Sequence, residues 1–159
     1  LKEIGLKSLT YSDRYLMAPL VISMLSSVLR ATPGRGNVEV FVDMAKAEHL
    51  PFEPRMIWDN FKSDAQRIDV IQALLPGVTL SMERKNDLPH YRALSGELND
   101  GRKFVMLLDQ GFGAWRAQGT VRHDFEGTPT QQAKMLVKQT GDLASYTEQG
   151  APIAFNFNV

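Results

Sequence analysis

The sequence predicts a single α/β domain of three layers, in which helices cover both faces of a mixed β-sheet. Strand-like segments with a two-residue apolar period alternate with segments of helical spacing through the first half of the chain. Two further strand-like segments follow each other directly around Asn99-Asp100-Gly101, a turn that joins antiparallel neighbours. A chain of 159 residues with no linker or internal repeat fits one domain over residues 1–159.

Two pairs of a strand and a helix are predicted before the third strand. Pro19 is tolerated because it falls in the first turn of its helix, where no backbone N–H is needed. Pro76-Gly77 ends the second helix, whose apolar side chains recur at helical spacing. In chain order, we expect a strand at 5–13, a helix at 18–31, a strand at 38–44, a helix at 53–75 and a strand at 78–84.

The second half of the chain predicts a hairpin, a long loop, a helix and a final strand. The loop is polar and contains glycine, and loops of this length in compact domains are often functional. In chain order, we expect strands at 90–98 and 102–108, a surface loop at 116–129, a helix at 130–146 and a strand at 152–159. Asp13 and Asp43 would both lie at the carboxyl ends of their strands.

The composition excludes several classes of function. Lys and Arg together number 18, as do Asp and Glu, so no overall positive field attracts nucleic acid or an anionic membrane, and any such contact is local. With no cysteine, the chain has no thiol nucleophile and no Cys-based zinc site. No apolar segment is long enough to span a bilayer. We expect a cytoplasmic fragment of a larger protein, because the chain opens with neither an initiator Met nor a signal peptide.

His90 and Arg92 are the first candidates for a functional site. Residues two apart on a strand point to the same side of the sheet, about 7 Å apart, so the pair could hold one phosphate. The guanidinium fork suits phosphate oxygens, and a neutral imidazole could act as a nucleophile or carry a proton. In the alternative interpretation, His90 caps a turn and Arg92 pairs with a carboxylate.

Asp13 and Arg14 follow the first strand and allow two interpretations. The carboxyl ends of strands in open α/β sheets commonly bind ligands, which favours Arg14 as a ligand-binding residue supported by Asp13. Alternatively, Asp13 caps the helix that begins near Leu16, and Arg14 is solvated.

The segment after the hairpin, Gly-Phe-Gly-Ala-Trp, is equally open. Gly111 and Gly113 permit positive φ or a close backbone approach, so their amides could hold an anion. A tight turn that buries Phe112 and Trp115 is the alternative. Asp109 could receive the arginine of the hairpin.

Four basic groups occur near the hairpin, with aromatic residues between them, and could together follow a phosphate backbone. Solvated surface charge is the alternative. The groups are Arg84-Lys85, Arg102-Lys103, Arg116 and Arg122.

The run His90-Tyr-Arg92-Ala-Leu-Ser-Gly-Glu97, followed by a hairpin and a Gly-rich turn, resembles a degenerate copy of the HxKxxxxD motif of the phospholipase D superfamily. His90 matches the nucleophile, Arg92 the phosphate-binding lysine, and Glu97 the aspartate. The order of Ser-Asp-Arg-Tyr-Leu at 12–16, His-x-Arg at 90–92 and Leu-Asp-Gln-Gly-Phe-Gly-Ala-Trp at 108–115 is more closely similar to the phospholipase D-like domain C-terminal to MIT domains and to its bacterial relatives.

The resemblance implies a phospholipase D-like fold and a phosphate-bearing ligand. Catalysis in that superfamily needs two His motifs, and this chain offers one, so an enzyme would be a homodimer that pairs two copies of His90. Arg92 in place of Lys, Glu97 in place of Asp, and the missing Gly-Ser-x-Asn signature favour binding without catalysis.

We therefore expect a phosphate-recognising, non-catalytic accessory module of a larger bacterial protein, which the resemblance implies to be helicase-like, nucleic-acid-processing or engaged in phage defence. Nucleic acid is expected as the ligand before phospholipid. Two alternatives stay open: a metal-independent phosphodiesterase or nuclease formed by a homodimer with His90 as nucleophile, and a plain protein-interaction domain. No cofactor and no metal are expected, because no cluster has ligand spacing.

Overall fold

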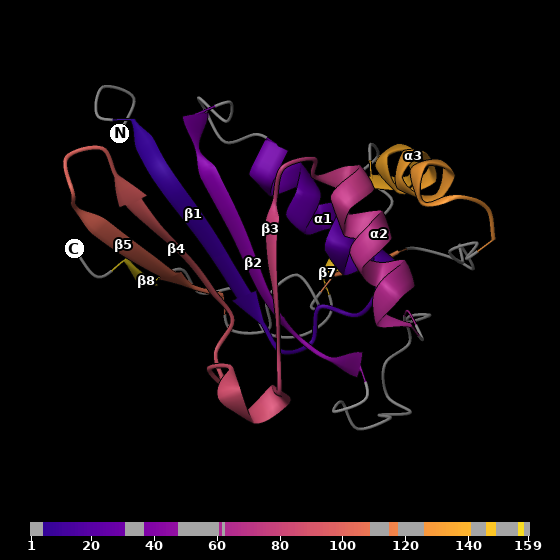
Figure 1. Cartoon of the computed structure of the whole chain (residues 1–159), viewed down its shortest axis with the longest axis horizontal. Helices are drawn as coiled ribbons and strands as arrows, with labels where there is room; N and C mark the ends of the chain where they lie inside the picture. Colours follow the sequence, from indigo (N-terminus) through magenta and orange to yellow (C-terminus); the bar gives the residue numbers. More distant parts are fainter. Residues whose placement is uncertain are drawn as a thin grey trace.

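A computed structural model describes residues 5–30, 37–47, 61, 63–108, 115–117, 126–140, 146–148 and 156–157. Its elements follow the predicted alternation of strands and helices (Figure 1). In chain order they are β1 (Leu6–Asp13), α1 (Pro19–Arg30), β2 (Glu39–Ala45), α2 (Asp64–Leu74), β3 (Thr79–Glu83), the 3-10 helix η3 (Lys85–Asp87), β4 (Ala93–Leu98), β5 (Lys103–Leu107), β6 (Trp115–Ala117), α3 (Pro129–Thr140), β7 (Tyr146–Glu148) and β8 (Asn156–Phe157).

The main sheet has six strands in the order β3-β2-β1-β4-β5-β8. β1, β2 and β3 are parallel, whereas β4 pairs with the other side of β1 in the antiparallel sense. The predicted mixed sheet is therefore confirmed. β1 is the strand at which the parallel half meets the antiparallel half, so polar residues at its carboxyl end lie where open α/β sheets bind ligands.

The three described α-helices lie together on one side of this sheet. The strand order moves from β1 to β2 to β3 in one direction, so two right-handed crossovers place α1 and α2 on the same face. α3 packs against both of them (Figure 1). The expectation of helices on both faces is thus wrong for the described residues, because a second face is covered only when the chain reverses direction across the sheet.

One apolar core joins the sheet to these helices. Alternate residues of β1 and β2, including Leu9, Tyr11, Val40 and Val42, are buried beneath the helices. Their neighbours along the strands are only half-buried, as the two-residue period requires.

Two helix boundaries differ by several residues from the expected ones. The second helix begins at Asp64 after the extended Ser63, and not at residue 53; residues 51–60 and 62 lie outside the described residues. The third helix ends at Thr140, and Tyr146 begins β7, which pairs with β6. These two short strands fall partly on segments expected to be loop and helix, since spacing alone does not reveal a pairing between distant segments.

α3 begins one residue earlier than expected because its first turn carries a reciprocal cap. Gln131 N donates to Thr128 Oγ1 at 3.3 Å, and Thr128 N donates to Gln131 Oε1 at 2.8 Å. This is the capping box, and Pro129 between them occupies a position that needs no amide proton.

The hairpin of β4 and β5 closes as predicted. Gly101 has a positive φ of 86°, which a residue with a side chain rarely adopts, and Gly101 N donates to Leu98 O at 2.9 Å. β4 begins at Ala93, three residues after the expected start, and His90 lies on a bend before it.

Gly96 allows β4 to approach β1 and the ring of Phe104. A Cβ at this position would lie 2.6 Å from two ring atoms of Phe104 and 2.9 Å from Ser8 O. We expect Gly96→Ala to lower the free energy of unfolding by about 1–3 kcal/mol, the usual cost of overpacking. Urea denaturation measures this loss. Ser95→Ala, on the neighbouring half-buried position, is the control, and equal stability of the two variants would contradict the predicted clash.

Candidate functional site

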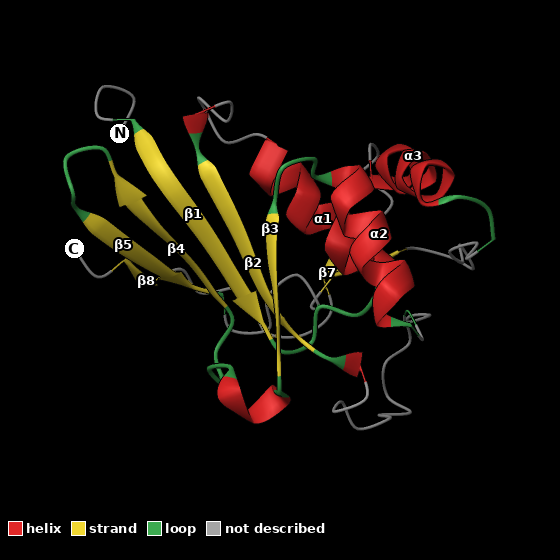
Figure 2. Ribbon diagram, viewed as in Figure 1, coloured by secondary structure: helices red, strands yellow, loops and turns green. Residues whose placement is uncertain are grey.

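The connection from β3 to β4 crosses the carboxyl ends of β2 and β1. β3 and β4 lie on opposite sides of this pair, so residues 84–92 must pass beyond the strand ends to reach β4. Figure 2 shows this connection, with η3 in it, beyond the ends of the parallel strands. The crossing brings Lys85, His90 and Arg92 to the same edge as Asp13 and Arg14.

Asp13 is the centre of the contacts at this edge. It ends β1 and is 3% exposed. The Tyr11 hydroxyl donates to Asp13 Oδ2 at 2.8 Å, and Tyr15 N donates to Asp13 Oδ1 at 2.7 Å. Arg92 Nε lies 3.5 Å from the same Oδ1 in an ion pair. The carboxylate thus joins β1, the loop after it and the start of β4, and its contact with Tyr15 N is a local turn, not a helix cap, because α1 begins only at Pro19.

Tyr15 gathers two cations at the same edge. Lys85 Nζ lies 5.0 Å from the centroid of the Tyr15 ring, and Arg92 Cζ lies 4.8 Å from it. Both distances are those of a cation–π contact. The Tyr15 ring, in the loop after β1, therefore contacts one cation from each end of the β3–β4 connection.

Arg14 fastens the middle of that connection. Its Nε donates to Leu88 O at 2.8 Å, and its Nη2 donates to the same oxygen. The Leu88 side chain is buried, so the connection is held by one polar and one apolar contact. Arg14 is therefore not simply solvated, because its guanidinium binds the backbone of the connection.

Arg67, in α2, holds the backbone on the buried side of the site. This arginine is fully buried in α2, and its guanidinium donates to Leu16 O at 3.0 Å, Ala45 O at 2.7 Å and Asp64 Oδ1 at 2.7 Å. Asp64 also accepts from Ala47 N at 3.0 Å. One side chain therefore joins the segments that follow β1 and β2 to the second helix. Burial lowers the pKa of Arg67, but the adjacent Asp64 carboxylate favours the charged form.

The structure separates the residues that the phospholipase D-like motif would group. His90 is exposed on the connection and precedes β4, so the strand period does not pair it with the half-buried Arg92. Glu97 lies near the far end of β4, about 16 Å along the strand from Arg92. Its carboxylate contacts Lys7 Nζ at 2.6 Å and Lys103 Nζ at 3.7 Å. Glu97 thus does not adjoin Arg92.

Three further candidates, Gly111, Gly113 and Asp109, lie outside the described residues. Asp13 occupies the role that was expected of Asp109, as the carboxylate beside Arg92. Asp43 lies within β2, two residues before its end, and accepts a hydrogen bond from Ser12 Oγ at 2.9 Å.

The basic groups near the hairpin divide between the two edges of the sheet. Arg84-Lys85 lie at the carboxyl edge of the parallel strands, whereas Arg102 and Lys103 lie at the opposite edge, where they contact Asp100 and Glu97. The Arg116 side chain and Arg122 are not among the described parts of the chain.

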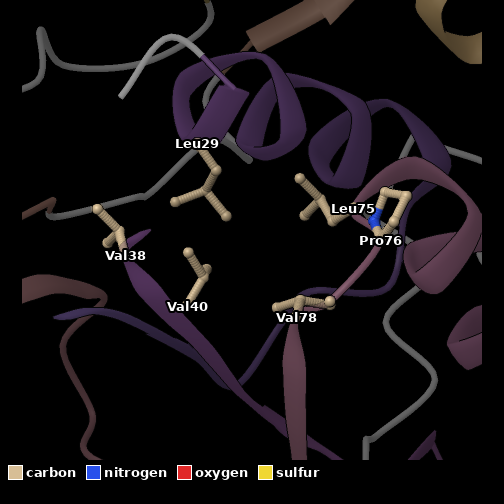
Figure 3. A pocket seen from close by; sticks show the side chains of 7 residues that line it. Leu29, Val38, Val40, Leu75, Pro76 and Val78 are labelled. Atoms are coloured by element: carbon tan, nitrogen blue, oxygen red, sulfur yellow. The ribbon is translucent and has the colours of Figure 1, made fainter. Parts of the chain in front are cut away.

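A pocket of about 480 Å³ opens at that opposite edge. Figure 3 shows side chains from the end of α1, the start of β2 and the segment before β3 around it. They are apolar and carry no group that would recognise phosphate. The labelled side chains are Leu29, Val38, Val40, Leu75, Pro76 and Val78.

The sequence analysis did not indicate Tyr11 or Arg67 as parts of the site, and it indicated Lys85 only as a basic group that could follow a phosphate backbone. A signal for Arg67 existed, because Arg67, Val70, Ile71 and Leu74 follow the spacing of one helical face and all are buried. A charged residue on an apolar face indicates a buried polar contact. Tyr11 precedes Asp13 by two residues on β1, so the strand period already places both side chains on one face. Lys85 meets Tyr15 only through the crossing connection, which no local pattern reveals.

Fold and charge define an α/β domain with a basic connection at the switch point of its sheet. The family model described as DEAD/DEAH box helicase YjiV, C-terminal domain, matches residues 1–156, and the chain belongs to this family. The comparisons with curated proteins and with solved structures give no match. The expectation of an accessory module of a larger, helicase-like protein is confirmed at this level. No described helix is long and apolar enough to cross a membrane, and the described residues contain no cluster suited to a metal ion.

The ionisation of Asp13 is open to a direct test. Burial raises the pKa of this carboxyl, against the lowering effect of Arg92 and the two hydrogen bonds. We expect a pH titration followed by carboxyl-carbon NMR to give a pKa above the usual value of about 3.9. The unfolded chain then binds fewer protons than the folded one as Asp13 ionises, so the stability due to this group is present at low pH and falls as the pH rises through the raised pKa.

The variant Asp13→Asn isolates this contribution. Its free energy of unfolding relative to that of the unchanged protein should increase as the pH rises from below the ordinary aspartate pKa through the raised one. A pKa at or below 3.9, or a difference that falls with pH, would show that the pairing with Arg92 outweighs the cost of burial.

Proposed function

We propose that this domain binds nucleic-acid phosphates through the β3–β4 connection, as an accessory module of a helicase-like protein. The observation that carries the proposal is the crossing of the carboxyl edge by residues 84–92, in which Arg84, Lys85 and Arg92 outnumber the acidic Asp87. Membership of a helicase C-terminal family makes nucleic acid the available polyanion.

The charges of the connection divide into two groups with different tasks. Arg92 joins the connection to Asp13, and Arg14, from the loop after β1, binds Leu88 O within the connection. The first task of these two arginines is therefore to fix the shape of the connection. Arg84 and His90 are exposed, and Lys85 is half-buried beside Tyr15. The two exposed groups and the ammonium group of Lys85 reach a phosphate without breaking a contact to the buried carboxylate, so Arg84, Lys85 and His90 are the proposed ligand-binding residues.

From the phospholipase D-like resemblance this proposal takes only the binding of phosphate, and not the catalysis. Phosphoryl transfer by a histidine requires a cation that holds the phosphate beside it. Arg92 lies against Asp13, which reduces the charge that it can offer to a ligand. This arrangement supports binding in preference to catalysis.

The binding proposal is tested by removing charge from one edge of the sheet at a time. We expect Arg84→Ala/Lys85→Ala to weaken binding of a labelled oligonucleotide by at least about tenfold, because each charge-assisted hydrogen bond contributes about 1.5–3 kcal/mol when formed. The slope of log affinity against log salt should fall by about one for each lost phosphate contact. Fluorescence anisotropy over a salt series measures both quantities.

The matched control is Arg102→Ala/Lys103→Ala, which removes the same net charge from the opposite edge. Equal losses in the two double variants would contradict a local site and indicate only a general effect of charge. Vesicles of phosphatidylcholine with phosphatidylserine are the comparison ligand, and tighter binding to them than to the oligonucleotide would assign the connection to lipid.

Catalysis is tested separately with bis(p-nitrophenyl) phosphate in EDTA. We expect no hydrolysis, because Arg92, which matches the motif's phosphate-binding cation, is paired with the Asp13 carboxylate. Turnover by a dimer that disappears in a folded His90→Ala variant would overturn this expectation and establish a metal-independent phosphodiesterase.

A further inference from the structure

We infer that the connection binds single-stranded nucleic acid, with Tyr91 as the residue that stacks on an unpaired base. This inference rests on the proposed function and adds the class of substrate. It assigns a role to the one residue between His90 and Arg92 that neither the phosphate-binding nor the scaffolding contacts use.

Tyr91 is 54% exposed, although an aromatic side chain of its size normally contributes to a core. It is the most exposed of the large hydrophobic residues whose burial is described; Val28, Val105 and Val137 are 40–44% exposed. A single exposed hydrophobic residue is common on protein surfaces. The position of Tyr91, in the middle of the basic connection, is what separates it from the three valines.

The neighbours of Tyr91 are held in place from below. Leu88 is buried and bound by Arg14, and Arg92 is paired with Asp13, while Arg92 O also accepts from Leu108 N at 2.8 Å. Tyr91 therefore stands between two fixed points, and its Cα is about 3.8 Å from that of Arg92. A ring on a fixed backbone loses little conformational freedom when it binds, which suits it to stacking.

The combination of charge and ring favours single strands over a duplex. A duplex presents phosphates at its surface, but its bases are stacked on one another and expose no free face on which the Tyr91 ring could stack. A single strand offers both phosphates and unpaired bases, which stack on aromatic side chains while cations follow the backbone. Tyr91 with Arg84 and Lys85 provides both kinds of contact on one connection.

The experiment compares Tyr91→Ala, Tyr91→Phe and Val105→Ala in the full 159-residue chain. Each protein is titrated against a labelled oligothymidylate and against a labelled duplex at one salt concentration, after thermal unfolding has shown that it is folded. We expect the unchanged protein to prefer the single strand. Tyr91→Ala should lose roughly 5- to 100-fold in affinity for it, the range for one base–aromatic stack.

The remaining variants determine what the loss means. Tyr91→Phe should stay within about twofold of the unchanged protein, since the ring and not the hydroxyl makes the stack. Val105→Ala, which shortens another exposed apolar side chain on β5, should have no effect. Equal losses on single strand and duplex in Tyr91→Ala, or no loss beyond that of Val105→Ala, would overturn the inference and leave the proposed phosphate binding intact. Failure of the unchanged protein to bind either probe at low salt would instead overturn the proposed function and the inference with it.

Discussion

The buried carboxylate of Asp13 is the constraint on which the carboxyl edge of the sheet depends. A charge at 3% exposure is tolerated when its oxygens are hydrogen-bonded and paired, and here the partners come from β1, the loop after it and the residue before β4. Because all three reach one carboxylate, the backbone around it is constrained at three points. The exposed part of the connection is consequently presented from a rigid base.

Much of the fold follows from short-range patterns. The periods of β1 and β2, the Pro at the start of α1 and the Asn-Asp-Gly turn were sufficient to predict the order of strands and helices and the antiparallel hairpin. The prediction that helices cover both faces of the sheet was wrong for the described residues, because the side that a helix covers depends on the direction of successive crossovers. The β6–β7 pair was missed for a related reason, since each strand has only three residues and finds its partner far along the chain.

The candidate site was predictable in place but not in its internal contacts. Asp13, Arg14, His90 and Arg92 do meet at one edge, as strand ends and a hairpin start would suggest. Which of them bind one another depends on how far each side chain is buried. Asp13 is buried and is paired with Arg92, whereas His90 is exposed on a bend outside the strand. Glu97 shows the limit of a linear motif, because five residues of extended chain carry it to the other edge.

The central position of β1 also governs how the domain is made. On one side β1 pairs with β2, about 30 residues further along, but on the other it pairs with β4, which begins only at Ala93. During synthesis, β1 therefore keeps one row of unpaired backbone groups exposed until more than half of the domain has been translated. The Asp13 carboxylate cannot pair with Arg92 until the same point in synthesis, because Arg92 directly precedes β4. The contacts at the carboxyl edge and the protection of the open strand edge are therefore completed in one late event.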